Sequence, residues 1–521
     1  MGAVTLSFSV DGREVTVTDD GASLLEVLRD RLGLRSAKDG CSPQGQCGCC
    51  TVLVDGSPRV SCVTPARRVA GRSVVTLDGL PDDERARWGE AFCATGASQC
   101  GFCTPGIIVR LSGLRAKGVV PDDDAAVERA LAAHLCRCTG WRTIIDAYAA
   151  MGAYGAPEGK AGPGRDLDAA SRRATIEGHA PQRVAPDVAL GRAGFADDGA
   201  PPDALVALLT PAGDWVVGET LTEARALSGT HQGRRTTAGL RHPVDVPPGD
   251  WAVTLQTTWV EPAYLETDAS WCAPGGVPAS PLANGGAFGG KAGSDLGRVA
   301  RRLADEHGRP VRVLLSREDT VRLGAKRPPV AGGVDASGSG ILRVARAVGI
   351  EAVVASVAPG LAVEQVDVPG PPTGLGLRAA GWAEAAVLVA AATGATEIRS
   401  PRGAVAEAEV AGGGLRVRVS CGDPLDPVVL RSYCIGAAHM ALGWVTSEGL
   451  AVDDAGEVHD LTIRSFGVLR AADTPPVEIE IDDGDGEPVS GSDAVFAAVA
   501  LAVWRDQCLA PAWPTLVRFP A

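Results

Sequence analysis

The chain has 521 residues, 45% of them hydrophobic, which is enough for about three or four domains with cores of their own. A net charge of -14 at pH 7 argues against nucleic acid and anionic membranes as partners. We expect no secretion leader and no membrane span, because the first residues already alternate like strands and no long uninterrupted apolar run occurs. Fourteen cysteines without a leader predict a cytoplasmic protein whose thiols bind metals.

Residues 1–80 show the alternation and turn signals of a small mixed domain. Asp11-Gly12 and Asp55-Gly56 are hairpin turn signals, and Ser23 is a candidate helix N-cap. The predicted elements are strands at 4–10, 14–18, 51–54 and 59–63 and a helix at 23–32. Hairpin, helix, cysteine loop and hairpin follow one another as in a β-grasp ferredoxin.

The first cysteine group consists of Cys41, Cys47, Cys50 and the later Cys62. Plant-type [2Fe–2S] ferredoxins use C-x4-C-x2-C followed by a distant cysteine. Cys47 and Cys50 fit this spacing, whereas the loop from Cys41 to Cys47 is one residue longer. Cys49 is expected to point away from a cluster and to pack as a small residue. The alternative is a zinc knuckle or free thiols.

Residues 81–152 are predicted to be helical and carry the second cysteine group. Cys100 and Cys103 precede one predicted helix, and Cys136 and Cys138 precede another, so helix dipoles would stabilise an anionic cluster. The expected helices cover residues 90–94, 105–117, 122–133 and 141–151. Zinc is again the alternative, and Cys93 is expected in the core.

The strings GQCGCCTVLVDG, SQCGFCTPGIIVRLSGL and HLCRCTGWRTI resemble the iron–sulfur region of the xanthine dehydrogenase/aldehyde oxidase family of molybdenum hydroxylases. The resemblance implies two [2Fe–2S] clusters. Cys100, Cys103, Cys136 and Cys138 would hold the one nearest the molybdenum cofactor. Cys41, Cys47, Cys50 and Cys62 would hold the one that passes electrons to flavin.

Residues 153–187 are rich in Gly, Pro, Ala and charged residues, which predicts a linker crossing the surface. Longer family members often carry a flavin domain at this position. The segment is too short for one and has no phosphate-gripping motif, so FAD is expected on a partner chain.

Residues 188–521 resemble a shortened molybdopterin-binding region, which completes an α+β multidomain fold class. Its glycine-rich segment 284–291 and the loop around Arg378 resemble the family's cofactor and substrate loops. The implied cofactor-binding residues are Gly285, Gly286, Phe288, Gly289, Gly290, Lys291 and Arg378. From the residues alone, the glycine run could equally be a turn between strands.

The catalytic carboxylate of the family has no clear counterpart. Glu487 matches a Gly-Glu-Pro string and is the candidate general base, although it ends an acidic run typical of a solvated turn. Asp493 is the other carboxylate near the last predicted helix. His439 beside an apolar helix is expected to be a core residue.

Two functional hypotheses follow, and a non-enzymatic redox sensor or scaffold ranks last. The first is an iron–sulfur electron-transfer subunit of an oxidoreductase complex, with a molybdopterin-binding large subunit and an FAD-binding subunit as partners. The second is a self-contained minimal hydroxylase of aldehydes or N-heterocycles that binds molybdopterin in its own C-terminal region. The cofactor is thus expected either in this chain or in a partner.

Overall fold

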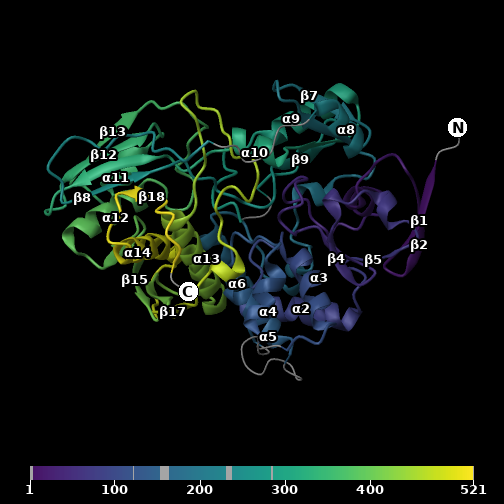
Figure 1. The fold of residues 1–521 in the computed structure, drawn as a ribbon, viewed down its shortest axis with the longest axis horizontal. Coiled ribbons are helices and arrows are strands. Elements are labelled where there is room, and N and C mark those ends of the chain that lie inside the picture. The colour runs from purple at the N-terminus through teal and green to yellow at the C-terminus, as the bar shows by residue number, and fades with distance from the viewer. Residues whose placement is uncertain (1–3, 121–122, 153–163, 230–237, 283–285, 520–521) are drawn as a thin grey trace.

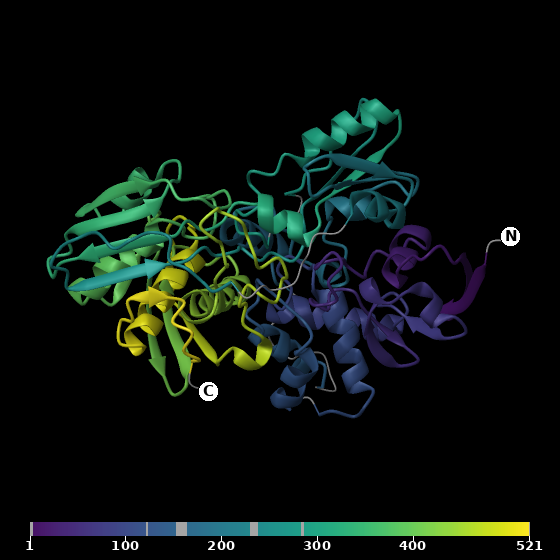
Figure 2. The same ribbon diagram turned by 45° about the horizontal axis from the view of Figure 1, so that its top comes forward.

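The computed structural model describes residues 4–120, 123–152, 164–229, 238–282 and 286–519. The N-terminal domain lies at one end of the molecule and the large C-terminal region at the other, with the helical domain between them (Figure 1). A smaller sheet with its helices stands over the junction, as the turned view makes clear (Figure 2). This α+β multidomain arrangement confirms the predicted fold class.

The N-terminal domain is a five-stranded β-grasp sheet in the order β2-β1-β5-β3-β4. Its strands are β1 (Thr5–Val10), β2 (Arg13–Thr18), β3 (Thr51–Val54), β4 (Ser57–Val60) and β5 (Ser73–Val75). Helix α1 (Leu24–Glu26), capped by Ser23, continues as a π-helical turn over Val27–Arg31. Alternation places Leu6, Phe8 and Val10 on one face, where they pack with the apolar side of this helix.

The second domain is the expected helical one, built from α2 (Asp82–Thr95), α3 (Thr104–Arg115), α4 (Asp124–Leu131) and α5 (Arg142–Ala150). Trp88 lies at its centre, with ring centroids 6.0 Å from Phe92 and 6.3 Å from Tyr148. Helix α3 begins directly after Cys103, and Pro105 occupies its first turn, where no amide donor is needed.

The C-terminal region contains three further sheets among its described residues. Two have four strands each, in the orders β7-β6-β10-β9 and β14-β15-β16-β17, and one has five, in the order β13-β12-β11-β8-β18. The strands are β6 (Leu205–Leu209), β7 (Trp215–Gly218), β8 (Val253–Thr257), β9 (Ala269–Cys272), β10 (Val311–Leu314), β11 (Val330–Val334), β12 (Gly340–Ala345), β13 (Leu361–Val366), β14 (Glu397–Arg399), β15 (Val405–Ala411), β16 (Gly414–Ser420), β17 (Val477–Ile481) and β18 (Ala512–Trp513).

Helices fill the space around these sheets and make the largest core of the molecule. They are α7 (Pro186–Ala189), α8 (Leu221–Ser228), α9 (Leu296–His307), α10 (Arg317–Leu323), α11 (Ile350–Ala355), α12 (Trp382–Thr393), α13 (Pro427–Thr446) and α14 (Gly491–Asp506). Within the described residues, α13 alone is long and apolar enough to cross a membrane, but 89% of its apolar window is buried inside the protein. It packs closely against α14.

The segment expected to be a surface linker differs from that expectation. Residues 164–187 include helix α6 (Leu167–Gly178), which packs against α13 and α14, while residues 153–163 lie outside the described part. Small residues such as Ala170 and Ala174 give α6 a narrow apolar face, and Arg173 pairs with Glu177 at 2.8 Å with both side chains fully buried. The sequence did not predict this helix because its buried face consists mainly of alanine, which is only weakly hydrophobic.

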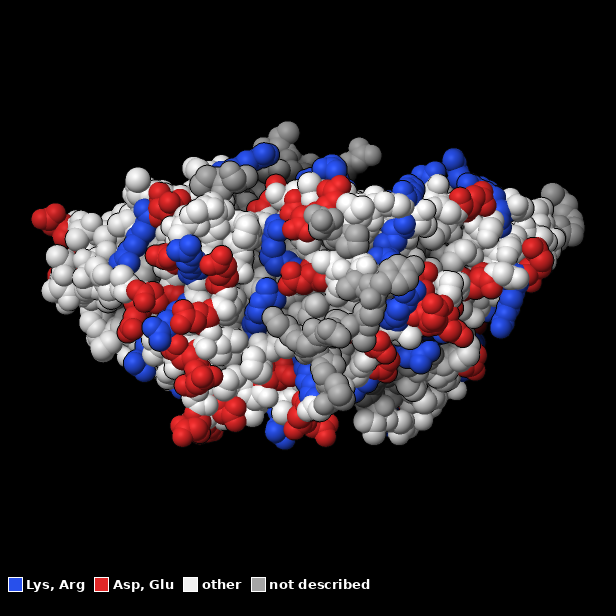
Figure 3. All heavy atoms as spheres, turned by 90° about the horizontal axis from the view of Figure 1, so that it is seen from below, with Lys and Arg blue, Asp and Glu red and all other residues white. Residues whose placement is uncertain are grey.

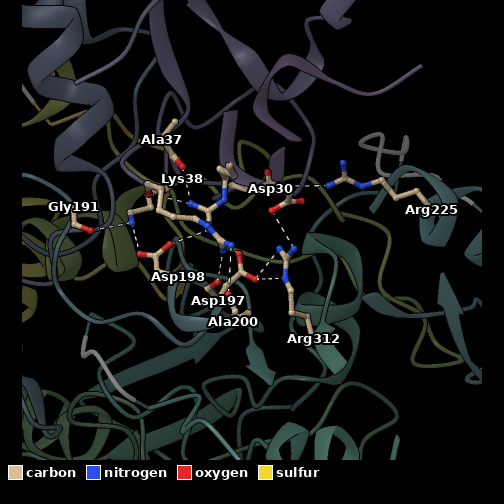
Figure 4. A network of polar contacts seen from close by, with 12 residues as sticks. Asp30, Ala37, Lys38, Gly191, Asp197, Asp198, Ala200, Arg225 and Arg312 are labelled. Atoms are coloured by element: carbon tan, nitrogen blue, oxygen red, sulfur yellow. Dashed lines mark hydrogen bonds and ion pairs between the residues drawn. The ribbon is translucent and has the colours of Figure 1, made fainter. Parts of the chain in front are cut away.

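A buried network of charges joins the N-terminal domain to the sheet that contains β10 (Figure 4). Arg29 contacts Asp197 at 2.7 Å and Asp198 at 2.9 Å, and Arg312 on β10 contacts Asp30 at 3.0 Å. Lys38 also pairs with Asp198. Over the outer face drawn in Figure 3, in contrast, acidic and basic side chains are interspersed. The network fixes how the first domain sits on the C-terminal region.

Candidate functional site

The first cysteine group gathers where the loop before β3 meets the turn after β4. Cys41, Cys47, Cys50 and Cys62 are all at most 4% exposed. Hydrogen bonds from the Cys47 and Cys62 thiols lower the pKa of Cys41 well below its ordinary value. Bonds to Cys41 and Cys50 raise the pKa of Cys62 well above it. The expected strand at 59–63 ends early, and the helical turn Ser61–Val63 brings Cys62 to the other three.

The second group gathers at the starts of α3 and α5. The Sγ atoms of Cys100 and Cys138 are 3.6 Å apart, and a hydrogen bond to Cys136 raises the pKa of Cys103. The Thr139 hydroxyl lies 3.1 Å from the Sγ of Cys136. All four thiols are buried. The positive end of α3 therefore lies next to the thiol of Cys103, which would be anionic as a ligand.

Both groups have the donor set of a binuclear centre. Contacts between thiols link the four cysteines of each group in one run, in the order Cys47, Cys41, Cys62, Cys50 and in the order Cys103, Cys136, Cys138, Cys100. In the described part of the chain, no three His, Cys, Asp or Glu side chains surround a single ion position. A structural zinc needs four ligands around one ion, whereas a [2Fe–2S] cluster takes two thiolates on each iron. Four buried thiols in each group match the donor set of one such cluster.

The two groups are neighbours. The amide of Leu135 donates to the carbonyl of Cys47 at 2.9 Å, which joins the two cysteine loops by one hydrogen bond. His134 packs on Gly48, where a Cβ would lie 2.4 Å from the imidazole ring. Burial and Arg110 lower the pKa of His134 to about 3, so the ring is neutral. A glycine at position 48 is therefore required for the domains to approach.

Cys49 lies in the contact between the two groups. It is fully buried, its thiol lies 3.9 Å from the carbonyl of Cys47, and burial raises its pKa. A Cβ on Gly40 would be 3.1 Å from the Sγ atoms of both Cys47 and Cys49. The thiol of Cys49 hydrogen-bonds the thiol of Cys47, so Cys49 is buried beside the first group but does not point away from it as expected.

Helix α13 covers the second group. A Cβ on Gly436 would lie 1.7 Å from the carbonyl oxygen of Cys138, so only glycine allows this approach. Gln99 donates to the carbonyl of Cys138 and to the Ser432 hydroxyl, each at 2.9 Å. The C-terminal region therefore excludes water from these thiols.

The predicted cofactor loop is packed against the protein itself, and Gly285 lies outside the described residues. Gly286 adopts φ +92° facing Cys100, and a Cβ there would be 2.7 Å from the Cβ of that cysteine. Gly289 meets the carbonyl of Gly376, and Gly290 meets Tyr264. These glycines do allow another group to approach the backbone closely, as predicted. That group is the protein's own backbone or side chains and not a cofactor.

The predicted cationic residues already have partners within the protein. Lys291 pairs with Glu266 at 2.7 Å, with both side chains largely buried. Arg378 lies over the ring of Phe288 at 4.0 Å and is 3.5 Å from Asp493. Neither cation is free to bind the phosphate of a pterin.

The cavity beside these residues is small. It has a volume of about 30 Å³ and is lined by Arg137, Val260, Glu261, Pro262, Ala287, Phe288, Arg327, Leu377, Arg378, Met440, Trp444, Glu448 and Phe496. Cofactor sites commonly offer about 300 Å³ or more. Arg327 fills part of the space, 4.1 Å from the Trp444 ring, and is paired with Glu384 at 2.7 Å. These residues do not fit a molybdopterin.

Glu487 is not brought to this cavity. It is exposed on the connection between β17 and α14 and does not line the cavity. Asp493, in the first turn of α14, is buried and contacts His179 at 2.9 Å. His439 is a core residue whose Nε2 lies 3.1 Å from the carbonyl of Leu469, and burial lowers its pKa to about 4.

Several buried carboxylates of this region were missed from the sequence. Glu177 accepts the amides of Gly491 and Ser492 at the start of α14, and Glu448 binds Arg137. Their signal was a single acidic residue within or beside an apolar stretch, which does not identify a distant partner.

Comparison with known proteins agrees with these centres. Residues 8–72 match the family model described as a 2Fe-2S iron-sulfur cluster binding domain, and residues 76–149 match a [2Fe-2S] binding domain. The nicotinate dehydrogenase small FeS subunit of Eubacterium barkeri is 36% identical over 146 residues, which are 28% of this chain and 92% of that protein. The xanthine dehydrogenase iron-sulfur-binding subunit of Escherichia coli O157:H7 is 41% identical over 128 residues, 24% and 79% of the two chains.

The whole fold is similar to a solved structure. The aldehyde oxidoreductase from Desulfovibrio desulfuricans superposes with a TM-score of 0.70 at 15% identity, over 96% of this chain and 97% of the other. Fold and cysteine groups together define an oxidoreductase with two [2Fe–2S]-binding domains. The chain belongs to the xanthine dehydrogenase/aldehyde oxidoreductase family of molybdenum hydroxylases, as its motifs predicted.

Proposed function

We propose that this chain is an electron-transfer component that serves a molybdenum centre on a partner chain. Cys41, Cys47, Cys50 and Cys62 would hold one [2Fe–2S] cluster, and Cys100, Cys103, Cys136 and Cys138 the other. A bound [2Fe–2S] cluster accepts and returns one electron at a time. The relatives named as subunits support partner chains here too. FAD would sit on one of these partners.

One contrast carries the proposal. Both cysteine groups are complete and buried, whereas the cavity lined by Phe288 and Arg378 measures about 30 Å³ and its arginines are paired with carboxylates. A phosphate-bearing pterin needs room and uncompensated cations, and the side chains present supply neither. The C-terminal region would then act as a cover and docking body.

The chain's own residues would define the route between the two groups. The Leu135 amide and the Cys47 carbonyl join the loops, and α13 keeps water from the second group. Near the first group, Val63 follows Cys62 and is 49% exposed, which offers a surface for an acceptor. All fourteen cysteines are free, which is consistent with the reducing cytoplasm we propose as its location.

Metal analysis of the purified full-length chain tests the proposal. We expect about four irons and no molybdenum per chain, with two rhombic paramagnetic signals after reduction. Stoichiometric molybdenum with hydroxylase activity in the chain alone would instead establish the self-contained hydroxylase. Zinc in place of iron would overturn both. Affinity purification from the native cell should recover a molybdenum-containing chain and a flavin-containing chain.

A further inference from the structure

We propose that residues 461–464 of the C-terminal region position the first cysteine loop, and that Arg464 makes the first cluster easier to reduce. This inference rests on the proposed ligation of that cluster by Cys41, Cys47, Cys50 and Cys62. Arg464 would be a positioning and tuning residue that touches no ligand side chain directly.

Two amides of the cysteine loop point at one sulfur. The backbone N–H of Gln44 lies 3.3 Å from the Sγ of Cys41, and that of Gln46 lies 3.4 Å from the same atom. Hydrogen bonds to ligand sulfurs and nearby charge are among the features that set the reduction potential of an iron–sulfur cluster. The orientation of these two residues therefore matters for the potential.

Residues 461–464 contact further polar atoms of the same two glutamines, and the Gln44 side chain also donates to Glu318 at 2.6 Å. The side-chain amide of Gln44 donates to the carbonyl of Leu461 at 2.9 Å and accepts from the amide of Ile463 at 3.0 Å. The Nε of Arg464 donates to the carbonyl of Gln46 at 3.0 Å, and its own amide lies 3.3 Å from the Gln46 side chain. The first cysteine loop, which is one residue longer than the plant-type spacing, is thus held in place by the C-terminal region.

Arg464 also bridges the two iron–sulfur domains. Its guanidinium donates to the carbonyl of Ala132 in the helical domain at 3.2 Å while holding Gln46 in the first. One C-terminal side chain therefore joins the first cysteine loop to the end of α4 in the helical domain.

The charge of Arg464 is not cancelled by an acid. Burial and Arg470 lower the pKa of Arg464, while Cys47 and Cys41 act in the opposite direction, and no carboxylate is among the charges acting on it within the described residues. Arg137, beside the second group, differs because Glu448 neutralises it. A positive charge favours the more negative, reduced state of a nearby cluster. Arg464 should therefore raise the potential of the first cluster selectively.

A redox titration of the full-length holoprotein, followed by electron paramagnetic resonance, tests this inference. The Cys62→Ser variant assigns the signal of the first cluster. In Arg464→Gln we expect that cluster to need a potential lower by about 59 mV at low salt, a tenfold change in its reduction equilibrium. Arg464→Lys should shift less, because the charge stays. Arg13→Gln, an equal charge loss on strand β2, should shift neither cluster.

Unchanged midpoints in Arg464→Gln, or equal shifts of both clusters, would overturn the inference while leaving the proposed function intact. An absence of both signals in the unmodified protein would instead refute the proposed function. If Arg464→Gln does not load iron, the Gln44→Leu variant tests the positioning role instead. It should release the irons of the first cluster to a chelator several-fold faster than the unmodified protein, and an unchanged rate would refute the positioning role.

Discussion

Arg137, which stands between Cys136 and Cys138, makes a bidentate contact with Glu448 at 2.5 and 2.8 Å although 311 residues separate them. Their side chains are 5% and 1% exposed. The pair ties the second cysteine loop to the end of α13, so the loop and its cover form one unit.

Glu448→Gln should therefore destabilise the protein strongly. Removing one partner of a buried ion pair leaves the other charge uncompensated, which costs about 3–5 kcal/mol. Chemical unfolding followed by loss of the visible cluster absorption measures this cost. The matched control is Asp367→Asn, which breaks the exposed pair with Arg346 and should leave the unfolding midpoint unchanged. Equal effects of the two substitutions would contradict the structural role of the pair.

Cys103→Ser and Cys49→Ser should differ although both cysteines are buried. Cys103 belongs to a proposed ligand set, so its loss should lower the iron content from about four to about two per chain. Cys49 lies outside the proposed ligand sets although its thiol contacts that of Cys47, and its serine variant should keep all the iron. Iron analysis with protein quantitation decides, and iron loss in Cys49→Ser would make that thiol a ligand.

Lys291→Met should destabilise the protein in a pH-dependent way. Burial raises the pKa of Glu266 to about 7, with Lys291 opposing the shift. A carboxyl whose folded pKa is raised contributes stability below its ordinary pKa and loses it as the pH rises through the folded value. Without the lysine, the loss on ionisation is larger.

The difference from the unmodified protein should therefore be small at pH 5 and reach about 3 kcal/mol at pH 8. Urea unfolding at both pH values measures it. Lys117→Met, at an exposed lysine, is the control and should show no such trend. A deficit in Lys291→Met that is equal at both pH values would exclude Glu266 as its source.

Gly436→Ala should reverse the usual effect of this substitution in a helix. Alanine normally stabilises a helix interior by about 1 kcal/mol relative to glycine. Here its Cβ would meet the carbonyl of Cys138 at 1.7 Å, so α13 must move off the second group. We expect about 1–3 kcal/mol of destabilisation and faster iron release. Gly293→Ala, where a Cβ meets nothing within 4 Å, should change neither.

Local patterns predicted the cysteine groups and most of the N-terminal elements, because short spacings and turns act over a few residues. The ion pairs escaped prediction because Arg137 and Glu448 meet only through the tertiary fold. For the glycine-rich loop, the sequence predicted the backbone conformation but not the neighbour. Gly286 and Gly289 indeed have positive φ and tight neighbours, but a sequence cannot tell whether the neighbour is a cofactor or the chain's own backbone.

Helix α13 is made of residues 427–446, which leave the ribosome long after the thiols they cover. Domains tend to fold in order of synthesis, at about 5–20 residues per second. The second thiol group is thus accessible to iron for tens of seconds before helix α13 has been synthesised. Chains supplied with iron during translation should fill this site more completely than finished apoprotein exposed to iron afterwards.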